Sequence, residues 1–184
     1  LFIRILKIVI CNLTKNLLEI AEESFSELVT RYRTPKRHHH TLEGHVYACI
    51  RELDDIFETS RNLFAQAALW VHDVCYDPQA HDNEAQSVRW MRNLFGNMRI
   101  SQGFIDKTAL IVETTSHIAP PYIMLFGTHG EKRAYDDLLD INADIACDAD
   151  LSILGKPEKE FNTYEARIRK EYAFVLESLF REKR

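Results

Sequence analysis

The stretch RNLFAQAALWVHDVCYDP, residues 61–78, decides the expected fold. Its first part is apolar on every side, and a helix of this kind is buried at the centre of a domain. We therefore predict a central helix over Arg61–Val74, with Pro78 ending the region. His72 and Asp73 close this helix, where a charge is costly unless it is paired or bound to a metal. A core histidine with a satisfied hydrogen bond would explain His72 alone, but Asp73 beside it favours a metal site.

The rest of the chain also predicts helices. Hydrophobic residues from Leu13 to Tyr32 recur at helical spacing, and Pro35 disfavours helix in the residue before it. Further helices are expected over residues 45–57, 83–97, 102–116, 132–147 and 158–181. The only strand candidate is Tyr122–Phe126. Because Gly and Pro are scarce, at 6 and 5 residues, we predict an all-α fold, a compact helical bundle.

Length, charge and cysteine content exclude several classes of protein. The 184 residues suit one domain, which we place at residues 13–184 behind a helical N-terminal extension of residues 1–12. The net charge of -5 opposes general binding of nucleic acid. The cysteines lie far apart in the sequence, which indicates free thiols in a reducing, cytoplasmic location. They are Cys11, Cys49, Cys75 and Cys147.

The N-terminal segment Leu1–Cys11 is apolar, but Arg4 and Lys7 interrupt it. It is shorter than the ~20 residues that a membrane-spanning helix needs, so we predict no membrane span. It also lacks the small-residue cleavage site of a signal peptide. We expect an amphipathic helix that packs on the domain or on a second copy of the chain, as in a homodimer. Contact with a membrane surface is the alternative.

Metal-binding side chains concentrate in four segments: residues 37–45, 70–78, 82–84 and 148–151. Two imidazoles with two carboxylates suit a divalent ion such as Mn, Fe, Co, Ni or Zn. Such an ion lowers the pKa of a coordinated water and polarises a phosphoryl oxygen. A second His-Asp pair, His81-Asp82, follows a proline in a polar stretch, and Asp82 there suits the start of a helix.

Five motifs stand in order along the chain: RYRTPKRHHHTLEGHVYACIREL, ALWVHDVCYDPQAHDNEAQS, LIVETTSH, LLDINADIACDADLSILG and FNTYEARIRKEYAFVL. Together they resemble a family of predicted metal-dependent phosphohydrolases of the HD superfamily. The resemblance covers about residues 13–180, and the order and spacing of the motifs agree with the family. It implies a compact helical bundle of the HD type with a metal site at its centre.

The resemblance also implies the metal ligands. HD proteins use one histidine, then an adjacent His-Asp pair, then a distant aspartate that usually follows an alanine. In this chain the pattern gives His45, His72, Asp73 and Asp150 as ligands of one divalent ion. The expected ion is Mn, Fe, Co, Ni, Zn or Mg. Asp150 follows Ala149 and so fits the last position better than Asp148.

Gly44 departs from the family pattern. Relatives carry a histidine four residues before the ligand histidine, whereas His40 stands five residues before His45. One extra residue rotates a helix by about 100°. His40 and His45 can keep the family's relation only if Gly44 is absorbed in the turn before the helix, and glycine favours such irregular backbone.

Several other residues are candidates for catalysis or substrate binding. Asp77 or Glu84 would act as a base or orient the nucleophile, or would cap or support the local structure. Lys36 and Arg37 would bind phosphate, or would belong to a solvated loop. His40 is a further candidate for contact with the substrate, and the histidine after the Thr114-Thr115 pair, His117, would line the pocket or make a structural hydrogen bond.

The resemblance implies metal-dependent hydrolysis of a phosphomonoester or phosphoanhydride, with a phosphorylated small molecule such as a nucleotide as substrate. Two alternatives stay open. A non-catalytic module would keep the fold and act by binding a partner, and Gly44 is the feature that supports it. A di-iron oxygenase on the same scaffold would need a second metal ion and further histidine ligands.

Overall fold

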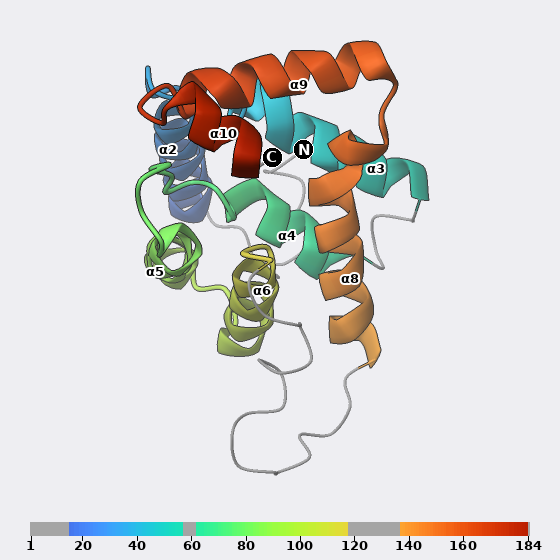
Figure 1. The fold of residues 1–184 in the computed structure, drawn as a ribbon. Coiled ribbons are helices and arrows are strands. Elements are labelled where there is room, and N and C mark those ends of the chain that lie inside the picture. Colours follow the sequence, from blue (N-terminus) through green and yellow to red (C-terminus); the bar gives the residue numbers. More distant parts are fainter. Residues whose placement is uncertain (1–14, 57–61, 118–136, 184) are drawn as a thin grey trace, which may run out of the picture.

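The computed structural model describes residues 15–56, 62–117 and 137–183. Within these ranges the chain is helical and contains no strand, which confirms the predicted all-α class. The predicted extension of residues 1–12 and the strand candidate Tyr122–Phe126 lie outside them. The helices and helical turns, shown in Figure 1, are α2 (Lys15–Tyr32), η1 (Leu42–Val46), α3 (Tyr47–Ile56), α4 (Leu63–Val71), α5 (Asn83–Asn97), α6 (Gln102–Thr114), α8 (Asp137–Leu151), η2 (Ser152–Gly155), α9 (Glu158–Glu171) and α10 (Glu177–Lys183).

Helix α4 lies at the centre of the bundle, where it packs against α3, α5, α6 and α8 (Figure 1). Every residue from Ala65 to Val71 is buried, as the apolar sequence predicts. The helix ends at Val71 rather than at the predicted Val74. Its end is a tight turn, because the N–H of Val74 bonds to the carbonyl of Val71 at 3.1 Å.

Helix α8 (Asp137–Leu151) ends later in the sequence than predicted and carries a candidate ligand. It runs to Leu151 instead of ending at Cys147, because the sequence offers no Gly or Pro before Gly155 to interrupt it. Asp150 therefore lies in the last helical turn instead of in a following loop. A rigid helix holds this carboxylate against the end of α4, which packs beside α8.

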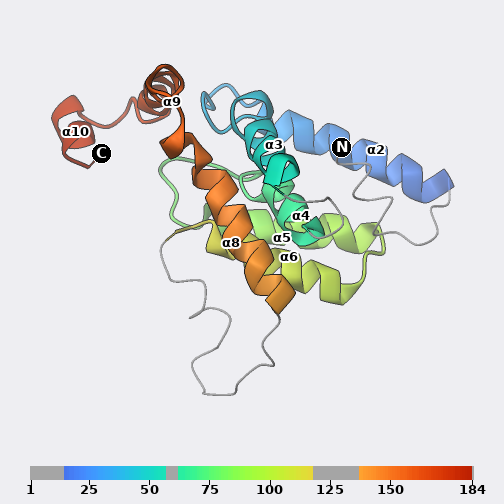
Figure 2. The same cartoon turned by 90° about the vertical axis from the view of Figure 1, so that its right-hand side faces the viewer.

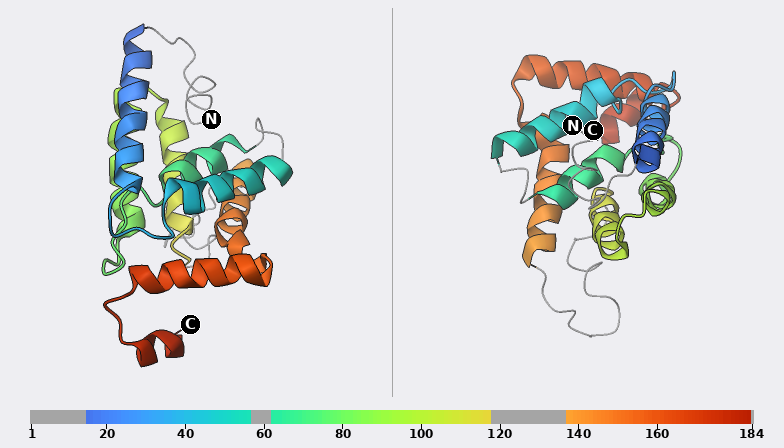
Figure 3. Two further views of the ribbon diagram at one scale, coloured as in Figure 1. Left: turned by 90° about the horizontal axis from the view of Figure 1, so that it is seen from above. Right: turned by 180° about the vertical axis from the view of Figure 1, so that it is seen from behind.

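Helix α9 lies across one end of the bundle, as the views of Figures 1 and 2 agree, and α10 follows it at the edge of the molecule (Figure 3). The sequence predicted one helix over residues 158–181, but the chain bends between α9 and α10. Arg169 stabilises the bend by donating to the carbonyls of Tyr172 and Val175, at 2.7 and 3.1 Å. This bend forms part of the wall of the cavity described below.

Among the described residues, no helix is both long enough and apolar enough to cross a membrane.

Candidate metal site

The four side chains that the family pattern selects meet at one point inside the bundle. His45 belongs to η1, His72 and Asp73 follow α4, and Asp150 ends α8. His72 is 2% exposed and His45 is 5% exposed. Three segments that are distant in the sequence thus bring two imidazoles and two carboxylates together. Two overlapping groups of side chains here could hold a metal ion: His45, His72 and Asp73, and His45, Cys49 and Asp150.

The distances between the donor atoms fit coordination of one ion. Nε2 of His45 lies 3.0 Å from Nε2 of His72 and 2.9 Å from Oδ1 of Asp150. Nε2 of His72 lies 3.1 Å from Oδ2 of Asp73 and 3.4 Å from Oδ1 of Asp150. Two donors about 2.1 Å from one ion are separated by about 3.0 Å at a right angle and by about 3.4 Å at a tetrahedral angle. The observed separations match these values.

A backbone carbonyl orients the ring of His72. Its Nδ1 lies 3.0 Å from the carbonyl oxygen of Leu69, one turn earlier in α4. A proton on Nδ1 donated to this carbonyl leaves the lone pair of Nε2 directed at the other ligands. Metal-binding histidines commonly have such an outer partner.

The charges of the cluster favour a cation at its centre. Burial alone would lower the pKa of His72, but the carboxylates of Asp73 and Asp150 raise it well above its ordinary value. Burial would likewise raise the pKa values of both carboxyls, and His72 outweighs it, so that both pKa values fall below the usual range. Two buried carboxylates thus demand positive charge beside them, which protons or a divalent ion can supply.

The extra residue Gly44 is absorbed in a π-helical turn. The carbonyl of Thr41 accepts from the N–H groups of both His45 and Val46, at 3.0 and 3.2 Å. A π-turn holds one residue more than an α-turn and often occurs at functional sites. A Cβ at Gly44 would lie 2.8 Å from Oγ1 of Thr41 and 2.9 Å from the carbonyl oxygen of His39. Glycine therefore lets the turn close tightly and place His45 among the ligands.

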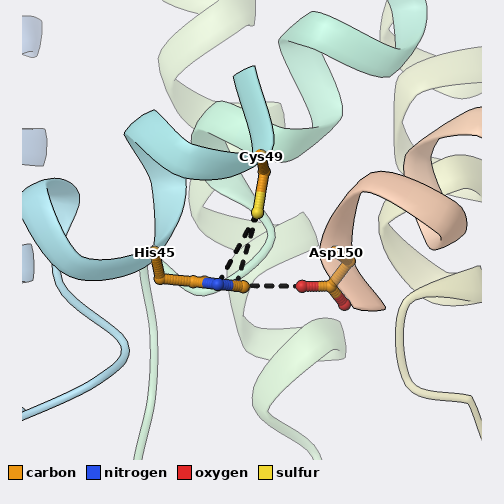
Figure 4. A group of neighbouring side chains, drawn as sticks. All are labelled: His45, Cys49 and Asp150. Carbon is orange, nitrogen blue, oxygen red and sulfur yellow. Dashed lines mark hydrogen bonds and ion pairs between the residues drawn. The ribbon is translucent and has the colours of Figure 1, made fainter. Parts of the chain in front are cut away.

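Cys49 also borders the site, which the sequence analysis missed. Its sulfur lies 3.6 Å from Nδ1 and 3.9 Å from Nε2 of His45, and within 4.8 Å of a carboxylate oxygen of Asp150 (Figure 4). Burial raises the pKa of this thiol well above its usual range, whereas the thiolate is the metal ligand. By geometry, Cys49 belongs with His45 and Asp150 to a group that could hold a metal ion. The signal available in the sequence was its position four residues after His45, one helical turn away.

Among the described residues, Cys49, Cys75 and Cys147 are free thiols, as predicted.

A cavity of about 720 Å³ opens onto the ligand set. Three other predicted site residues line it: His40, Glu84 and His117. Much of the remaining wall is aromatic or aliphatic and comes from α8, η2, α9, the bend before α10 and α10 itself. These apolar and aromatic residues include Leu154, Tyr164, Tyr172, Val175 and Phe180.

His117 binds the outer oxygen of a candidate ligand. Its Nε2 lies 2.9 Å from Oδ2 of Asp150, and this hydrogen bond raises the pKa of His117 to about 9. The backbone of His117 has a φ of 52°, a left-handed conformation that costs energy for any residue with a side chain. The turn after α6 thus presents His117 to α8 as a cation at neutral pH.

Arg37 does not line the cavity, and its guanidinium is already occupied. It is 7% exposed and donates to the carbonyls of Asp73, Val74 and His40, at 2.6, 3.0 and 3.1 Å. Arg37 therefore joins the loop before η1 to the loop after α4. This geometry replaces the predicted phosphate contact with a structural one, because no donor pair of the guanidinium is left to face a substrate.

We expect Arg37→Lys to lower the free energy of unfolding by about 3 kcal/mol, because a lysine cannot serve three carbonyls at once and leaves some of them buried without a donor. Urea unfolding would measure the change. If Arg37 bound phosphate instead, stability would be nearly unchanged, and turnover of charged substrates alone would fall.

Lys36 and Asp77 are also placed away from the cavity. Lys36 is exposed on the loop before η1. Asp77 is exposed too, and its carboxylate accepts from the N–H of Gln79 at 2.9 Å, as a turn residue does. Glu84 is the acidic candidate that lines the cavity. The second His-Asp pair, His81-Asp82, is exposed at the start of α5, with Asp82 at the N-cap position.

Glu171 is a buried residue near the site that the sequence analysis did not identify. Its Oε1 accepts from three consecutive backbone N–H groups, those of His38, His39 and His40, at 2.7, 2.8 and 3.0 Å. Its Oε2 lies 2.6 Å from Nδ1 of His40. Tyr76 stacks on the same ring, with the two centroids 4.1 Å apart. Glu171 thus fixes the histidine loop and the orientation of His40.

Comparisons of the chain with models of protein families, with curated proteins and with solved structures returned no match.

Proposed function

We propose that this chain is a metal-dependent phosphohydrolase with a bundle of the HD type, and that His45, His72, Asp73 and Asp150 hold one divalent ion at its centre. The observation that carries the proposal is the convergence of these four donors, with separations of 2.9 to 3.5 Å between each imidazole Nε2 and its neighbours. An ion bound there would supply an acidified water nucleophile and polarise a phosphoryl oxygen.

The surrounding residues have separate tasks in this proposal. Glu84 lines the cavity and can take the proton of the attacking water on its carboxylate. His40 has its Nδ1 engaged by Glu171, so its Nε2 is the ring atom free to contact the phosphoryl group or the leaving oxygen. His117 donates from Nε2 to Asp150 and adds a positive charge near the phosphate.

The oxygenase alternative has one observation in its favour. Oδ2 of Asp150 faces His117, while its Oδ1 faces the other ligands. A carboxylate placed in this way could bridge two ions, one of them held by His117. The number of ions per chain therefore separates the two candidates. The Gly44 insertion, which supported a non-catalytic module, leaves His45 within the ligand set.

The deciding experiment combines metal analysis with turnover. Protein purified without chelator would be analysed for metal content, stripped, reloaded with each divalent metal, and assayed on a panel of phosphomonoesters and phosphoanhydrides. One ion per chain with metal-dependent release of phosphate supports the proposal. Two irons per chain favour the oxygenase, and bound metal without turnover of any panel member favours the module.

A further inference from the structure

A second cavity opens onto the same ligand set from another side. It has a volume of about 570 Å³ and shares five lining residues with the first cavity: His39, His45, Asp150, Ile153 and Tyr164. The two cavities differ in charge. The first has no Lys or Arg among its lining residues, whereas four cations line the second: Arg51, Lys156, Lys159 and Arg167. A substrate that reaches the ligand set can therefore extend into two chemically different spaces.

Arg167 is the cation of the second cavity best placed to bind a ligand. It comes from α9 and is half-buried, and within the described part of the chain its guanidinium has no hydrogen-bond or ion-pair partner. Lys156 instead pairs with Glu52, and Lys159 is exposed. A half-buried guanidinium without a partner is suited to bidentate binding of an oxyanion.

Gly44 brings Arg167 close to the ligand set. A Cβ built at Gly44 would lie 3.2 Å from Nη1 of Arg167, and His45 is the next residue. The π-turn that positions His45 therefore also leaves the space that the guanidinium occupies. The same small residue connects the candidate ligand to the cationic cavity.

His39 provides a second, independent indication of a ligand in this cavity. It is 4% exposed, lines the cavity, and its Nδ1 is buried without a hydrogen-bond partner among the described residues. Nearly all buried polar atoms have a partner, so the unpartnered nitrogen of a residue that lines the same cavity as Arg167 indicates a place for a ligand atom.

The acidic residues that line the second cavity leave the space beside Arg167 and His39 free for an anion. Glu43 is exposed and lies 3.6 Å from Arg33, and Glu52 is paired with Lys156. Asp55 and Glu160 are exposed to solvent, which screens their charge. The remaining one, Asp150, belongs to the ligand set and is paired with His45 and His117.

We propose that the second cavity binds a further phosphate of the substrate through Arg167 and Nδ1 of His39, so that the preferred substrates carry a phosphate beyond the one that reacts. The inference rests on the proposed function and adds a substrate class to it: phosphoanhydrides rather than simple monoesters. The uncharged part of such a substrate would occupy the first, largely apolar cavity.

The test compares binding of pyrophosphate and of inorganic phosphate to the Mn²⁺-loaded protein by calorimetry. We expect the wild type to bind pyrophosphate at least about tenfold more tightly. Arg167→Met should reduce this ratio by roughly ten- to a hundredfold, the effect of one lost charge-assisted hydrogen bond. Methionine retains much of the packing of the arginine stem. Lys159→Met, from the exposed rim of the same cavity, is the matched control and should change the ratio less than about threefold.

Several outcomes would overturn the inference. One is a wild type without preference for pyrophosphate, which needs no variant to detect. Another is an equal loss of both ligands in Arg167→Met, which would place Arg167 on the reacting phosphoryl group. If that variant does not fold, Arg167→Lys serves in its place, because it keeps the charge and loses the bidentate geometry; an unchanged ratio would again contradict the inference.

Turnover separates this inference from the proposed function. Hydrolysis of an aryl monophosphate without any pyrophosphate preference would leave the phosphohydrolase proposal standing and remove only the second phosphate site. Pyrophosphate binding that depends on Arg167, without turnover of any ester or anhydride, would retain the anion site and remove the proposed reaction.

Discussion

Replacing His72 or Asp150 with alanine is expected to remove the bound metal and to lower kcat/KM on a phosphorylated substrate by on the order of a thousandfold, because the ion contributes several kcal/mol to stabilising the transition state. Helix content should stay close to that of the wild type. His72 and Asp150 stand at the ends of α4 and α8, so neither supplies the apolar contacts within those helices. Elemental analysis, kinetics and circular dichroism would measure the three quantities.

The matched control for this prediction is His81→Ala. His81 belongs to the chain's second His-Asp pair but is exposed before α5, and we expect full metal content and activity. Full metal content in His72→Ala or Asp150→Ala would contradict the assignment of that residue as a ligand. Loss of metal in His81→Ala would show that the ligands had been assigned to the wrong pair.

Glu171→Ala is expected to lower the free energy of unfolding by about 3–5 kcal/mol, since it leaves three backbone N–H groups and a histidine without their acceptor in a buried place. The carboxylate side chain of Glu171 is fully buried, so water cannot readily take over. Urea unfolding would measure the change. The exposed Glu177→Ala, from α10, is the control and should cost far less.

Glu171→Gln separates support of the fold from orientation of His40. Glutamine keeps one oxygen for the backbone N–H groups but can place an NH₂ group against Nδ1 of His40, which would favour the other ring tautomer. We expect a smaller loss of stability than for alanine and a changed tautomer of His40 by ¹⁵N NMR. We also expect a roughly ten- to hundredfold lower kcat/KM, the effect of losing one charge-assisted hydrogen bond from His40 to the substrate. An unchanged tautomer and unchanged kinetics would limit Glu171 to a structural role.

The pH dependence of stability gives a further readout of the same carboxylate. Burial opposes its ionisation, but the hydrogen bond and charge of His40 and the backbone N–H groups outweigh it, lowering the pKa of Glu171 from 4.5 to about 2. A lowered pKa stabilises the folded state fully above pH 4.5, and this stability is lost as the pH falls towards 2. Between these values the wild type should lose stability more steeply than Glu171→Gln.

Local patterns in the sequence predicted the helical framework well. The apolar stretch around Ala65–Val71 is buried throughout, as expected for a central helix. Helix α5 has the predicted bounds of Asn83–Asn97. Such features depend on periodicity and on residues that start or interrupt helices, and these act over a few neighbouring positions. The predicted ends of helices were less accurate at two places. A tight turn ends α4 after Val71, and hydrogen bonds of Arg169 stabilise the bend after α9.

What the sequence by itself determined is the all-α class, the central apolar helix and the histidines and aspartates that could hold a metal. Only the tertiary structure decided which of these residues face one another. The guanidinium of Arg37 donates to two backbone carbonyls that lie 36 and 37 residues later in the chain. Its geometry therefore supports a structural role instead of the expected contact with phosphate. Glu171 was missed because its partners lie 131 to 133 residues earlier in the chain. Hydrogen bonds between distant segments leave no periodic trace in a single sequence, since they arise only after packing has brought the helices together.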